Sequence, residues 1–456
     1  MMDFLENIVN FVNGVFWGKN ILAVMLLGAG VYFTIRTRFL PIRMFPEIIK
    51  VVTEKTEGRR EEDMTSFQAF CVSTASRIGA GNLAGVVAAV SIGGPGALFW
   101  MWVVALVGSS SAFIECTLAQ IYKEKDPEGG YRGGPAYFME KALNKRWMGV
   151  LFAISGLICW AGISQIVANS VTESFDNAFG IPKLYSATGM ALLAAMIIFG
   201  KKNKIARVLD KLVPVMAGLY ALVVLFIMVK NFTLLPSVFL SIFKNAFGIE
   251  QVMGGGIGVV IISGIKRGLF SNEAGSGSAP CAAAAAAVAH PVKQGLIQAL
   301  GVFIDTLIIC SATAFVILLA DKGATDGLVG MSLLQAAMVN HIGSFGTTFI
   351  AIILFLFSFS TFLGILFYAK SNVAFLMEGQ LPQNLYKAFA ITMIFAGGMN
   401  QYLFVWGLAD MGVGLMTFIN IFAIIPLCGV ALDSLKDYES KYMNKKATEA
   451  ESETTL

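Results

Sequence analysis

The chain has 456 residues, of which 56% are hydrophobic and 14% are charged, and its formal net charge is +4. In soluble domains about a quarter of the residues are charged, and no polar stretch in this chain is long enough to form such a domain. The composition therefore indicates one integral membrane unit rather than a set of soluble domains, and the small net charge does not favour a nucleic-acid partner.

Apolar segments of membrane-spanning length recur along the whole chain. A spanning helix needs about 20 mainly apolar residues. By that criterion we predict about eleven spans, of which the fifth and tenth are short. In order they cover residues 15–35, 66–92, 96–122, 147–171, 184–200, 212–230, 252–271, 295–320, 346–369, 386–400 and 406–431. Residues 1–14 lack a basic leader, so we expect no cleavable signal peptide.

Lysines and arginines between the spans predict the orientation, because cytoplasmic loops are enriched in them. One side of the predicted arrangement holds 25 of these residues and the other side holds five. This asymmetry predicts a cytoplasmic C-terminus, an N-terminus outside the cell and an odd number of spans in the cell membrane. The charged tail is expected to be disordered beyond Tyr442.

Two glycine-containing segments interrupt the spans at matching places. Residues 77–85 read Arg-Ile-Gly-Ala-Gly-Asn-Leu-Ala-Gly, and residues 267–275 read Arg-Gly-Leu-Phe-Ser-Asn-Glu-Ala-Gly. Glycine costs a helix interior about 1 kcal/mol relative to alanine, and an arginine near the bilayer centre costs roughly 2.5–3.5 kcal/mol. The two segments lie in the second and seventh spans, which run in opposite predicted directions. Such a pair is typical of transporters built from inverted repeats.

We therefore predict an all-α integral membrane protein with a five-plus-five inverted repeat, in which each half begins with a discontinuous helix. The predicted units are an extra N-terminal helix with a cytoplasmic loop, the first repeat, the second repeat and a cytoplasmic tail, at residues 1–65, 66–230, 252–432 and 433–456. The six cysteines are scattered without a CxxC pair, so neither a disulfide framework nor a metal cluster is expected.

The two breaks suggest the kind of ligand. Where a spanning helix unwinds, its freed backbone groups must bind a ligand or face a cavity. A carboxylate suits the freed N–H groups at the N-terminus of a half-helix, whereas a sodium ion suits carbonyl and hydroxyl oxygens. A zwitterionic amino acid that travels with a cation meets both requirements, and glycines that allow close backbone approach leave room for a small side chain.

Four motifs resemble those of the alanine/glycine:cation symporter family. They are Gly-Ala-Gly-Asn-Leu-Ala-Gly-Val at 79–86, Gly-Gly-Pro-Gly-Ala-Leu-Phe-Trp-Met-Trp at 93–102, Arg-Gly-Gly-Pro-Ala-Tyr at 132–137 and Gly-Leu-Phe-Ser-Asn-Glu-Ala-Gly at 268–275. The resemblance covers nearly the whole chain. It implies the leucine-transporter-like fold of the amino acid–polyamine–cation superfamily, and sodium- or proton-driven uptake of alanine or glycine.

The resemblance also implies site residues. The N–H groups of the first break would hold the substrate carboxylate, Asn82 would support the turn, oxygens of the second break would hold the ammonium group, and Gln165 could face the substrate. The substrate residues so implied are Gly79, Ala80, Gly81, Asn82, Gln165, Gly268, Phe270, Ser271 and Asn272.

For sodium, the resemblance implies three backbone carbonyls and two adjacent hydroxyls. The carbonyls belong to Ala75, Ile78 and Phe357, and the hydroxyls to Ser360 and Thr361. The alternative for each hydroxyl is a hydrogen bond back to its own helix. No cofactor is expected besides this coupling ion.

Three positions depart from the family pattern. Ala80 stands where the family usually has threonine, Val167 stands where a glutamine is expected, and Lys370 stands where we expect an acidic residue. Because these departures affect selectivity and coupling, proton-coupled or exchange transport of a small amino acid on the same fold remains the alternative.

Charged residues inside the spans are functional candidates. We expect Arg77 and Arg267 to pair with carbonyls or with an acid such as Glu273, with clamping of the substrate carboxylate as the alternative. Glu115 and Asp305 could be functional or structural, and Asp410, near the outer end of the last span, is expected to face water.

Other classes of protein fit less well. A membrane-embedded enzyme would need a nucleophile–base pair or a metal cluster, yet the chain has two histidines, far apart in sequence. A channel would need polar faces along several spans, whereas polar residues here concentrate at two breaks. We therefore predict a secondary active transporter, not an enzyme, that couples uptake of alanine and glycine to sodium across the lipid bilayer.

Overall fold

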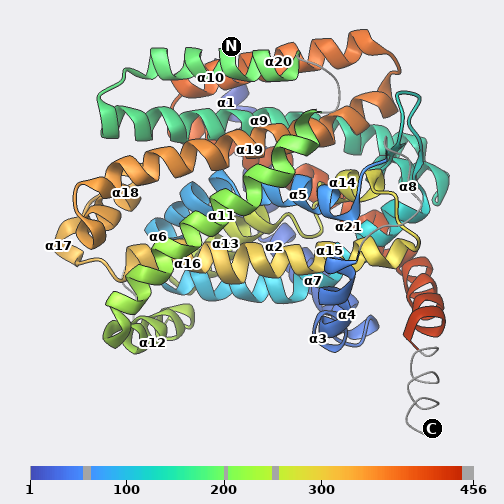
Figure 1. Cartoon of the computed structure of the whole chain (residues 1–456), viewed down its shortest axis with the longest axis horizontal. Coiled ribbons are helices and arrows are strands. Elements are labelled where there is room, and N and C mark those ends of the chain that lie inside the picture. Colours follow the sequence, from blue (N-terminus) through green and yellow to red (C-terminus); the bar gives the residue numbers. More distant parts are fainter. Residues whose placement is uncertain (1, 55–62, 200–203, 249–255, 444–456) are drawn as a thin grey trace, which may run out of the picture.

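The computed structural model describes residues 2–54, 63–199, 204–248 and 256–443. The described chain is nearly all helical, and its long helices run roughly alongside one another (Figure 1). Residues 252–255, at the predicted start of the second repeat, residue 200 of the fifth predicted span and the tail from residue 444 lie outside the described residues.

The N-terminal region precedes the first broken helix. It consists of α1 (Met2–Asn13), η1 (Gly14–Gly18), α2 (Ile21–Arg36), α3 (Leu40–Arg43) and α4 (Phe45–Thr53). The predicted first span, 15–35, is wrong in detail: α1 was not expected, and α2 begins only after Asn20, whose left-handed φ of 60° breaks the helix. The chain bends by 44° there.

The next part of the chain contains the first predicted repeat. Its elements are α5 (Ser66–Arg77), η2 (Gly81–Gly85), α6 (Val86–Gly93), α7 (Gly96–Ile121), β1 (Glu124–Lys125), β2 (Tyr131–Arg132), α8 (Pro135–Lys141), α9 (Arg146–Phe179), α10 (Lys183–Ile198), α11 (Lys204–Lys230), η3 (Phe232–Leu234) and α12 (Leu235–Ala246). The strands β1 and β2 form an antiparallel hairpin. Helix α8 lies shortly before Trp147, and its residues 135–139 are buried.

The remaining elements contain the second predicted repeat. They are α13 (Gly256–Asn272), α14 (Ala279–Ala285), α15 (Pro291–Phe303), η4 (Ile304–Cys310), α16 (Ser311–Leu318), α17 (Lys322–Thr325), α18 (Gly330–Ile342), α19 (Phe345–Leu376), α20 (Gln380–Met399), α21 (Tyr402–Tyr438) and η5 (Glu439–Met443).

Each of the eleven predicted apolar segments coincides with a helix, or with a broken helix, within the described residues. In order these are α2, α5 with η2 and α6, α7, α9, α10, α11, α13, α15 with η4 and α16, α19, α20 and α21. By length and hydropathy alone, six helices in the described chain are able to cross a membrane, or up to eight spans if each of two bent pairs forms one. One of these bent pairs is α5 with the helix that follows, bent by 45°.

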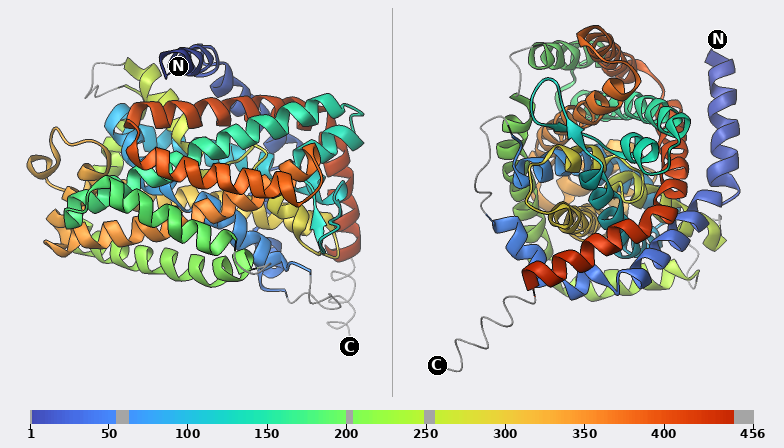
Figure 2. Two further views of the ribbon diagram at one scale, coloured as in Figure 1. Left: turned by 90° about the horizontal axis from the view of Figure 1, so that it is seen from above. Right: turned by 90° about the vertical axis from the view of Figure 1, so that its right-hand side faces the viewer.

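Small residues let the central helices approach closely. A Cβ added to Gly412 on α21 would overlap the backbone of Cys159 on α9, and one added to Gly264 on α13 would overlap the carbonyl of Ala97 on α7. Small residues at helix contacts are the usual means of packing in membranes. The right-hand view of Figure 2 shows helices surrounding shorter segments at the centre of the molecule. In Figure 1, α5, α13 and α14 are labelled in the middle of the bundle.

Candidate functional site

The first break lies where the sequence predicted it. Helix α5 ends at Arg77, residues 78 and 79 are irregular, and the second half-helix starts at Ala80 and the glycine after it. The Asn82 side chain supports the turn, since its Oδ1 accepts from Gly79 N at 2.9 Å while Asn82 N donates to Gly79 O at 3.2 Å. Among the described residues, the N–H groups of Ala80 and Gly81 make no hydrogen bond, so both remain available to a ligand.

The second break lies a few residues later than predicted. Helix α13 continues through Asn272, and the chain turns over residues 273–278 before α14. Glu273, Gly275 and Gly277 have φ of 57°, 82° and 87°, values that leave the helical region. The prediction that Gly268 lies in an unwound stretch is therefore wrong. This glycine lets α13 pack on α7, because an added Cβ would lie 3.2 Å from the Cα of Met101.

The two half-helix ends face each other. A Cβ on Gly81 would lie 3.2 Å from the Cα of Ser271 and 3.5 Å from the carbonyl oxygen of Phe270. The start of the second half-helix of break one, with its N–H groups, thus meets the C-terminal end of α13, with its carbonyls. A helix N-terminus favours negative charge and a helix C-terminus favours positive charge, so the pair matches the two ends of a zwitterion.

Asp305 joins the two breaks from η4. Its Oδ1 accepts from Asn82 Nδ2 at 2.7 Å, and its Oδ2 accepts from Ser271 Oγ at 2.7 Å and from Thr306 Oγ1 at 3.0 Å. Asn272 Nδ2 donates to the same threonine hydroxyl at 3.2 Å. All five side chains are buried. Three predicted substrate residues thus meet around a carboxylate that the sequence had marked as a candidate only by its place in a span.

The predicted sodium residues also come together. Thr361 Oγ1 donates to the carbonyl of Ala75 at 3.1 Å, although the two are 286 positions apart in the chain. A Cβ added to Gly79 would overlap Thr361 Oγ1 and lie 3.3 Å from the carbonyl oxygen of Phe357. Ser360 Oγ donates to Phe357 O, three residues earlier, at 2.8 Å. Ser360 therefore makes the hydrogen bond to its own helix that was the alternative reading, whereas Thr361 makes a contact between elements.

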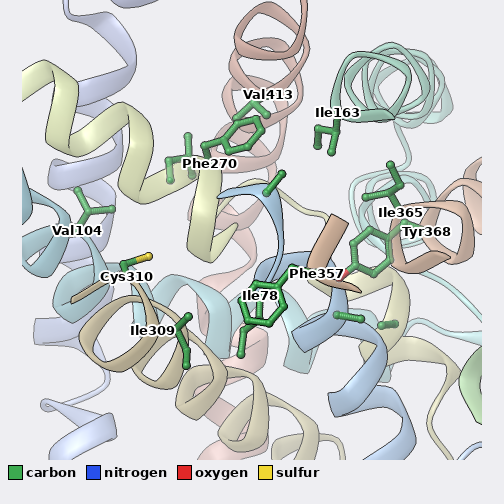
Figure 3. Packing of buried hydrophobic residues seen from close by; sticks show 14 of the residues in the cluster. Ile78, Val104, Ile163, Phe270, Ile309, Cys310, Phe357, Ile365, Tyr368 and Val413 are labelled. Carbon is green, nitrogen blue, oxygen red and sulfur yellow. The ribbon is translucent and has the colours of Figure 1, made fainter. Parts of the chain in front are cut away.

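Apolar side chains surround the first break. Figure 3 shows Ile78 beside Phe357, with Phe270 and Val413 on one side and Tyr368 and Ile365 on another. These apolar neighbours come from α9, α13, η4, α19 and α21 as well as from the break itself, and they include Ile163 and Cys310. A ligand that reaches the freed N–H groups would therefore place its side chain among hydrocarbon groups.

Two further buried carboxylates stabilise the second break. Glu115 on α7 accepts from Gly275 N and Gly277 N, both at 3.1 Å, and from Asn420 Nδ2 at 2.7 Å. Glu273 accepts from Ser76 Oγ at 2.6 Å and from Tyr368 OH at 3.3 Å. These bonds satisfy backbone groups that the turn would leave exposed in the membrane interior, and they tie α5 to the second break.

The two arginines differ in their partners. Arg77 donates to the carbonyl of Gln298 at 3.2 Å, which is one of the expected arrangements. Arg267 forms two hydrogen bonds to Asp410, at 3.1 and 3.2 Å, rather than pairing with Glu273. The expectation that Asp410 faces water is wrong: it is 3% exposed and also pairs with Lys266 at 2.7 Å. A buried carboxylate needs such partners to offset its desolvation.

The structure places the remaining named residues away from the breaks. Gln165 accepts from Asn400 Nδ2 at 2.9 Å, and its backbone packs on Gly397 of α20. Val167 is buried in the apolar core. Lys370 pairs with Asp126 and Glu128 near the β1–β2 hairpin, at 3.0 and 3.2 Å. A surface pocket lined by Asn177, Gln335 and Asn340, among others, contains none of the predicted site residues.

Comparison with known proteins shows which family the chain belongs to. The model of the sodium:alanine symporter family matches residues 2–453. The chain belongs to this family. It is a multi-pass membrane transporter and not an enzyme, as the sequence predicted.

Named relatives of this family member span nearly its whole length. A probable sodium/glutamine symporter, GlnT, of Bacillus subtilis is 46% identical over 441 residues, which cover 96% of this chain and 91% of the relative. The amino-acid carrier protein AlsT of the same organism is 46% identical over 439 residues, which cover 96% and 93%. The sodium/alanine symporter AgcS of Methanococcus maripaludis is 36% identical over 452 residues, which cover 97% and 99%.

Solved structures with low sequence identity share the fold. A substrate-bound, outward-open Na⁺-coupled sialic acid symporter superposes with a TM-score of 0.53 at 14% identity, covering 95% of this chain and 93% of that one. A manganese transporter of Eremococcus coleocola has a TM-score of 0.54 at 11% identity, covering 84% and 82%. Both are transporters, and the likeness extends to the fold alone.

Proposed function

We propose that this family member is a secondary active transporter that couples uptake of alanine and glycine to sodium by alternating access. The observation that carries the proposal is the meeting of the two broken helices. Free N–H groups at Ala80 and Gly81 face the carbonyl end of α13, and an oxygen-rich cluster lies beside them.

The substrate would bind between the two half-helix ends. Its carboxylate accepts hydrogen bonds from the amides of Ala80 and Gly81, at the positive end of the second half-helix. Its ammonium group lies towards the carbonyls of Phe270 and Ser271, with Asn82 and Asn272 holding the two backbones in place. Gly268 and Gln165 act in this proposal through packing rather than through contact with the substrate.

The sodium ion would bind where α5 ends against α19. Thr361 Oγ1 already reaches the carbonyl of Ala75, and the carbonyl of Phe357 lies close to Gly79. Carbonyls of Ala75, Ile78 and Phe357, with the hydroxyls of Ser360 and Thr361, supply five oxygen donors. Ser360 Oγ uses its proton in the bond to Phe357 O and keeps lone pairs for a cation.

The proposed topology is that of the sequence prediction. Eleven spans form an extra N-terminal helix and two inverted five-helix repeats, and the C-terminus lies in the cytoplasm of a cell whose plasma membrane holds the protein. The agreement of every predicted apolar segment with a helix supports this arrangement, as does the position of a broken helix in each half.

Asp305 favours a second candidate, proton-coupled transport on the same fold. A buried carboxylate that contacts Asn82 and Ser271 is placed to exchange a proton as the site opens and closes. The named relatives also make glutamine a substrate to test, since one of them is a probable sodium/glutamine symporter. The apolar wall of Phe270 and Tyr368 favours the smaller substrates.

Uptake into proteoliposomes tests the proposal. Labelled alanine should accumulate under an inward sodium gradient and not under an inward proton gradient alone. Thr361→Ala removes the hydroxyl that bridges α19 and α5, and it should raise the sodium concentration for half-maximal uptake about tenfold, which corresponds to about 1.4 kcal/mol.

Thr392→Ala is the matched control, because the Thr392 hydroxyl is exposed and bonds only to its own helix, at Ala388 O. The control should leave uptake unchanged. Accumulation driven by protons alone, and lost in Asp305→Asn, would overturn sodium coupling in favour of the second candidate.

A further inference from the structure

The segment after α2 carries an exposed face that mixes apolar and basic side chains. We call it the α3–α4 face. Phe39, Ile42, Phe45 and Ile49 are exposed over 57%, 71%, 50% and 44% of their surface. Arg36, Arg38, Arg43 and Lys50 are exposed on the same short stretch of chain. The α3–α4 face consists of these eight residues.

The opposite side of the segment is packed into the protein. Leu40, Met44 and Ile48 are at most 1% exposed, and α4 contacts α15. The exposed apolar residues therefore form a second apolar row, separate from the row that packs into the core. Leu40, Met44 and Ile48 occupy the core side of the segment, and the second row points outward.

The backbone turns sharply to lay this segment across the bundle. Arg38 and Phe39 have φ of 55° and 53°, an uncommon conformation for residues with a Cβ. In Figure 1, α4 lies at the edge of the bundle and runs across the direction of the long helices α7 and α15. That is the position of a helix lying in the plane of a membrane surface, beside the end of a span.

The acidic residues of the segment are held by other groups. Glu47 accepts from Tyr438 OH at 2.7 Å, and Glu54 pairs with Lys293 at 2.6 Å. Both partners lie in other helices. Among the basic residues, Arg43 pairs with Glu439 at 2.7 Å and Lys50 lies 3.7 Å from Glu47. Arg36 donates instead to the neutral hydroxyl of Tyr32 at 2.8 Å. Within the described residues Arg36 and Arg38 pair with no acidic side chain, so these two arginines carry the positive charge of the exposed side.

Helix α12 shows that this charge is not a general feature of exposed apolar helices here. It also exposes apolar side chains, including Phe239, Leu240 and Phe243. Its sequence, LPSVFLSIFKNA, contains a single basic residue, Lys244. The α3–α4 face has four basic residues in a stretch of 15, from 36 to 50. Contact with uncharged lipid alone would not require more basic residues on the α3–α4 face than on α12.

We propose that the α3–α4 face binds anionic phospholipid headgroups, with its apolar side chains at the headgroup–acyl boundary and with Arg36 and Arg38 on the lipid phosphates. An amphipathic helix with lysine and arginine beside an apolar face binds anionic membranes in this way. Long basic side chains reach the headgroups while their stems cover apolar surface. The proposal does not depend on the substrate or on the coupling ion.

Thermal stability in nanodiscs tests the charge requirement. The full chain is compared in phosphatidylcholine alone and in phosphatidylcholine with about a third phosphatidylglycerol. The anionic lipid should raise the unfolding midpoint of the wild type, and the double variant Arg36→Gln/Arg38→Gln should lose at least half of that shift. Lys19→Gln/Lys183→Gln, which removes two exposed lysines elsewhere, should keep it. Equal shifts in both double variants, or no shift in the wild type, would overturn the proposal.

A spin label on Ile42→Cys tests the position of the face. The six native cysteines are buried, so the new thiol is labelled selectively. In nanodiscs with phosphatidylglycerol the label should be relaxed by oxygen more than by a water-soluble nickel chelate. A label on Lys145→Cys, in an exposed connection, should show the reverse. A water-accessible label at position 42 would mean that another partner, such as an acidic protein, covers the face, and would overturn the lipid assignment.

Discussion

Gly79 lies closer to the proposed sodium ligands than a side chain would allow. An added Cβ would overlap Thr361 Oγ1 and crowd the carbonyl of Phe357. A hydroxyl that is pushed from its place no longer lines up with the carbonyl of Ala75. The absence of a side chain at this one position therefore lets α5 end directly against α19.

Gly79→Ala should weaken sodium-dependent alanine binding at least tenfold, or by about 1.4 kcal/mol, because the methyl group displaces the Thr361 hydroxyl. Binding to purified protein at several sodium concentrations measures the effect. Gly85→Ala is the matched control, since its Cβ would lie 3.8 Å from Trp406, an ordinary contact. Equal behaviour of the two variants would contradict the proposed ion site.

Within the described part of the chain, Asp410 is the carboxylate that pairs with both Lys266 and Arg267. Asp410→Asn should lower the free energy of unfolding by about 3–5 kcal/mol, because it leaves the charge of Arg267 buried and unpaired. Thermal unfolding in detergent measures the loss. Asp433→Asn breaks a pair whose side chains are 77% and 75% exposed, and it should change stability by less than about 0.5 kcal/mol. Similar unfolding midpoints for both variants would show that the buried pair contributes little.

At the scale of elements, the glycines and charges predicted that each half contains a broken helix, but they did not predict for both breaks which residues are involved. The first break follows Arg77 as expected, because Gly79 and Gly81 fall together there with the capping side chain of Asn82. The second break is displaced, because Gly268 serves helix packing and the positive φ angles occur at Glu273, Gly275 and Gly277. A glycine alone does not tell these two uses apart.

Contacts between distant elements were beyond the sequence. Nothing near Asp410 in the chain shows that it meets Arg267, which is 143 positions away. Likewise, Asp305 was a candidate because of its place in a span, but its contacts with Asn82 and Ser271 depend on how η4 packs between the breaks. The hairpin and α18 were also not expected, since the hairpin strands have two residues each and α18 has 13, fewer than the roughly 20 residues of a span.

The connection after α7 provides a test by pH. Burial lowers the pKa of Lys123 to about 8, while Asp63 acts to raise it. The ammonium group donates to Gln120 Oε1 at 2.8 Å and to the carbonyl of Ala286 at 2.7 Å, so this lysine links α7 to the end of α14. An ordinary lysine in the unfolded chain has a pKa near 10.4.

Between pH 8 and about 10.4 the folded chain binds fewer protons at Lys123 than the unfolded chain does. The contribution of Lys123 to the free energy of unfolding therefore rises with pH in that window. From pH 7 to pH 10 the free energy of unfolding of the wild type should therefore rise by about 1–3 kcal/mol relative to that of Lys123→Met. Denaturation in detergent at several pH values measures it, with Lys125→Met, in the exposed part of β1, as control. The same pH dependence in both variants would contradict the assignment.

For the whole molecule, the apolar segments and the two breaks were enough to predict the class, because membrane insertion imposes helices of a minimum length and makes every unwound residue costly. The family match over residues 2–453 and the structures that share the fold agree with that class. What the sequence did not provide is the bend between α1 and α2, the close approach of Thr361 to Ala75 and the partners of the buried acids. These depend on tertiary packing.

The measurement that tests the account most directly is equilibrium binding of alanine to the purified protein, with sodium and with choline in its place. Glycine, leucine, glutamine and glutamate are measured beside it. Alanine and glycine should bind in sodium, more tightly than the other three, and alanine binding should weaken at least tenfold in choline, or by about 1.4 kcal/mol. Alanine binding that is indifferent to sodium would contradict the coupling ion. Absence of alanine and glycine binding in sodium would contradict the site between the two broken helices.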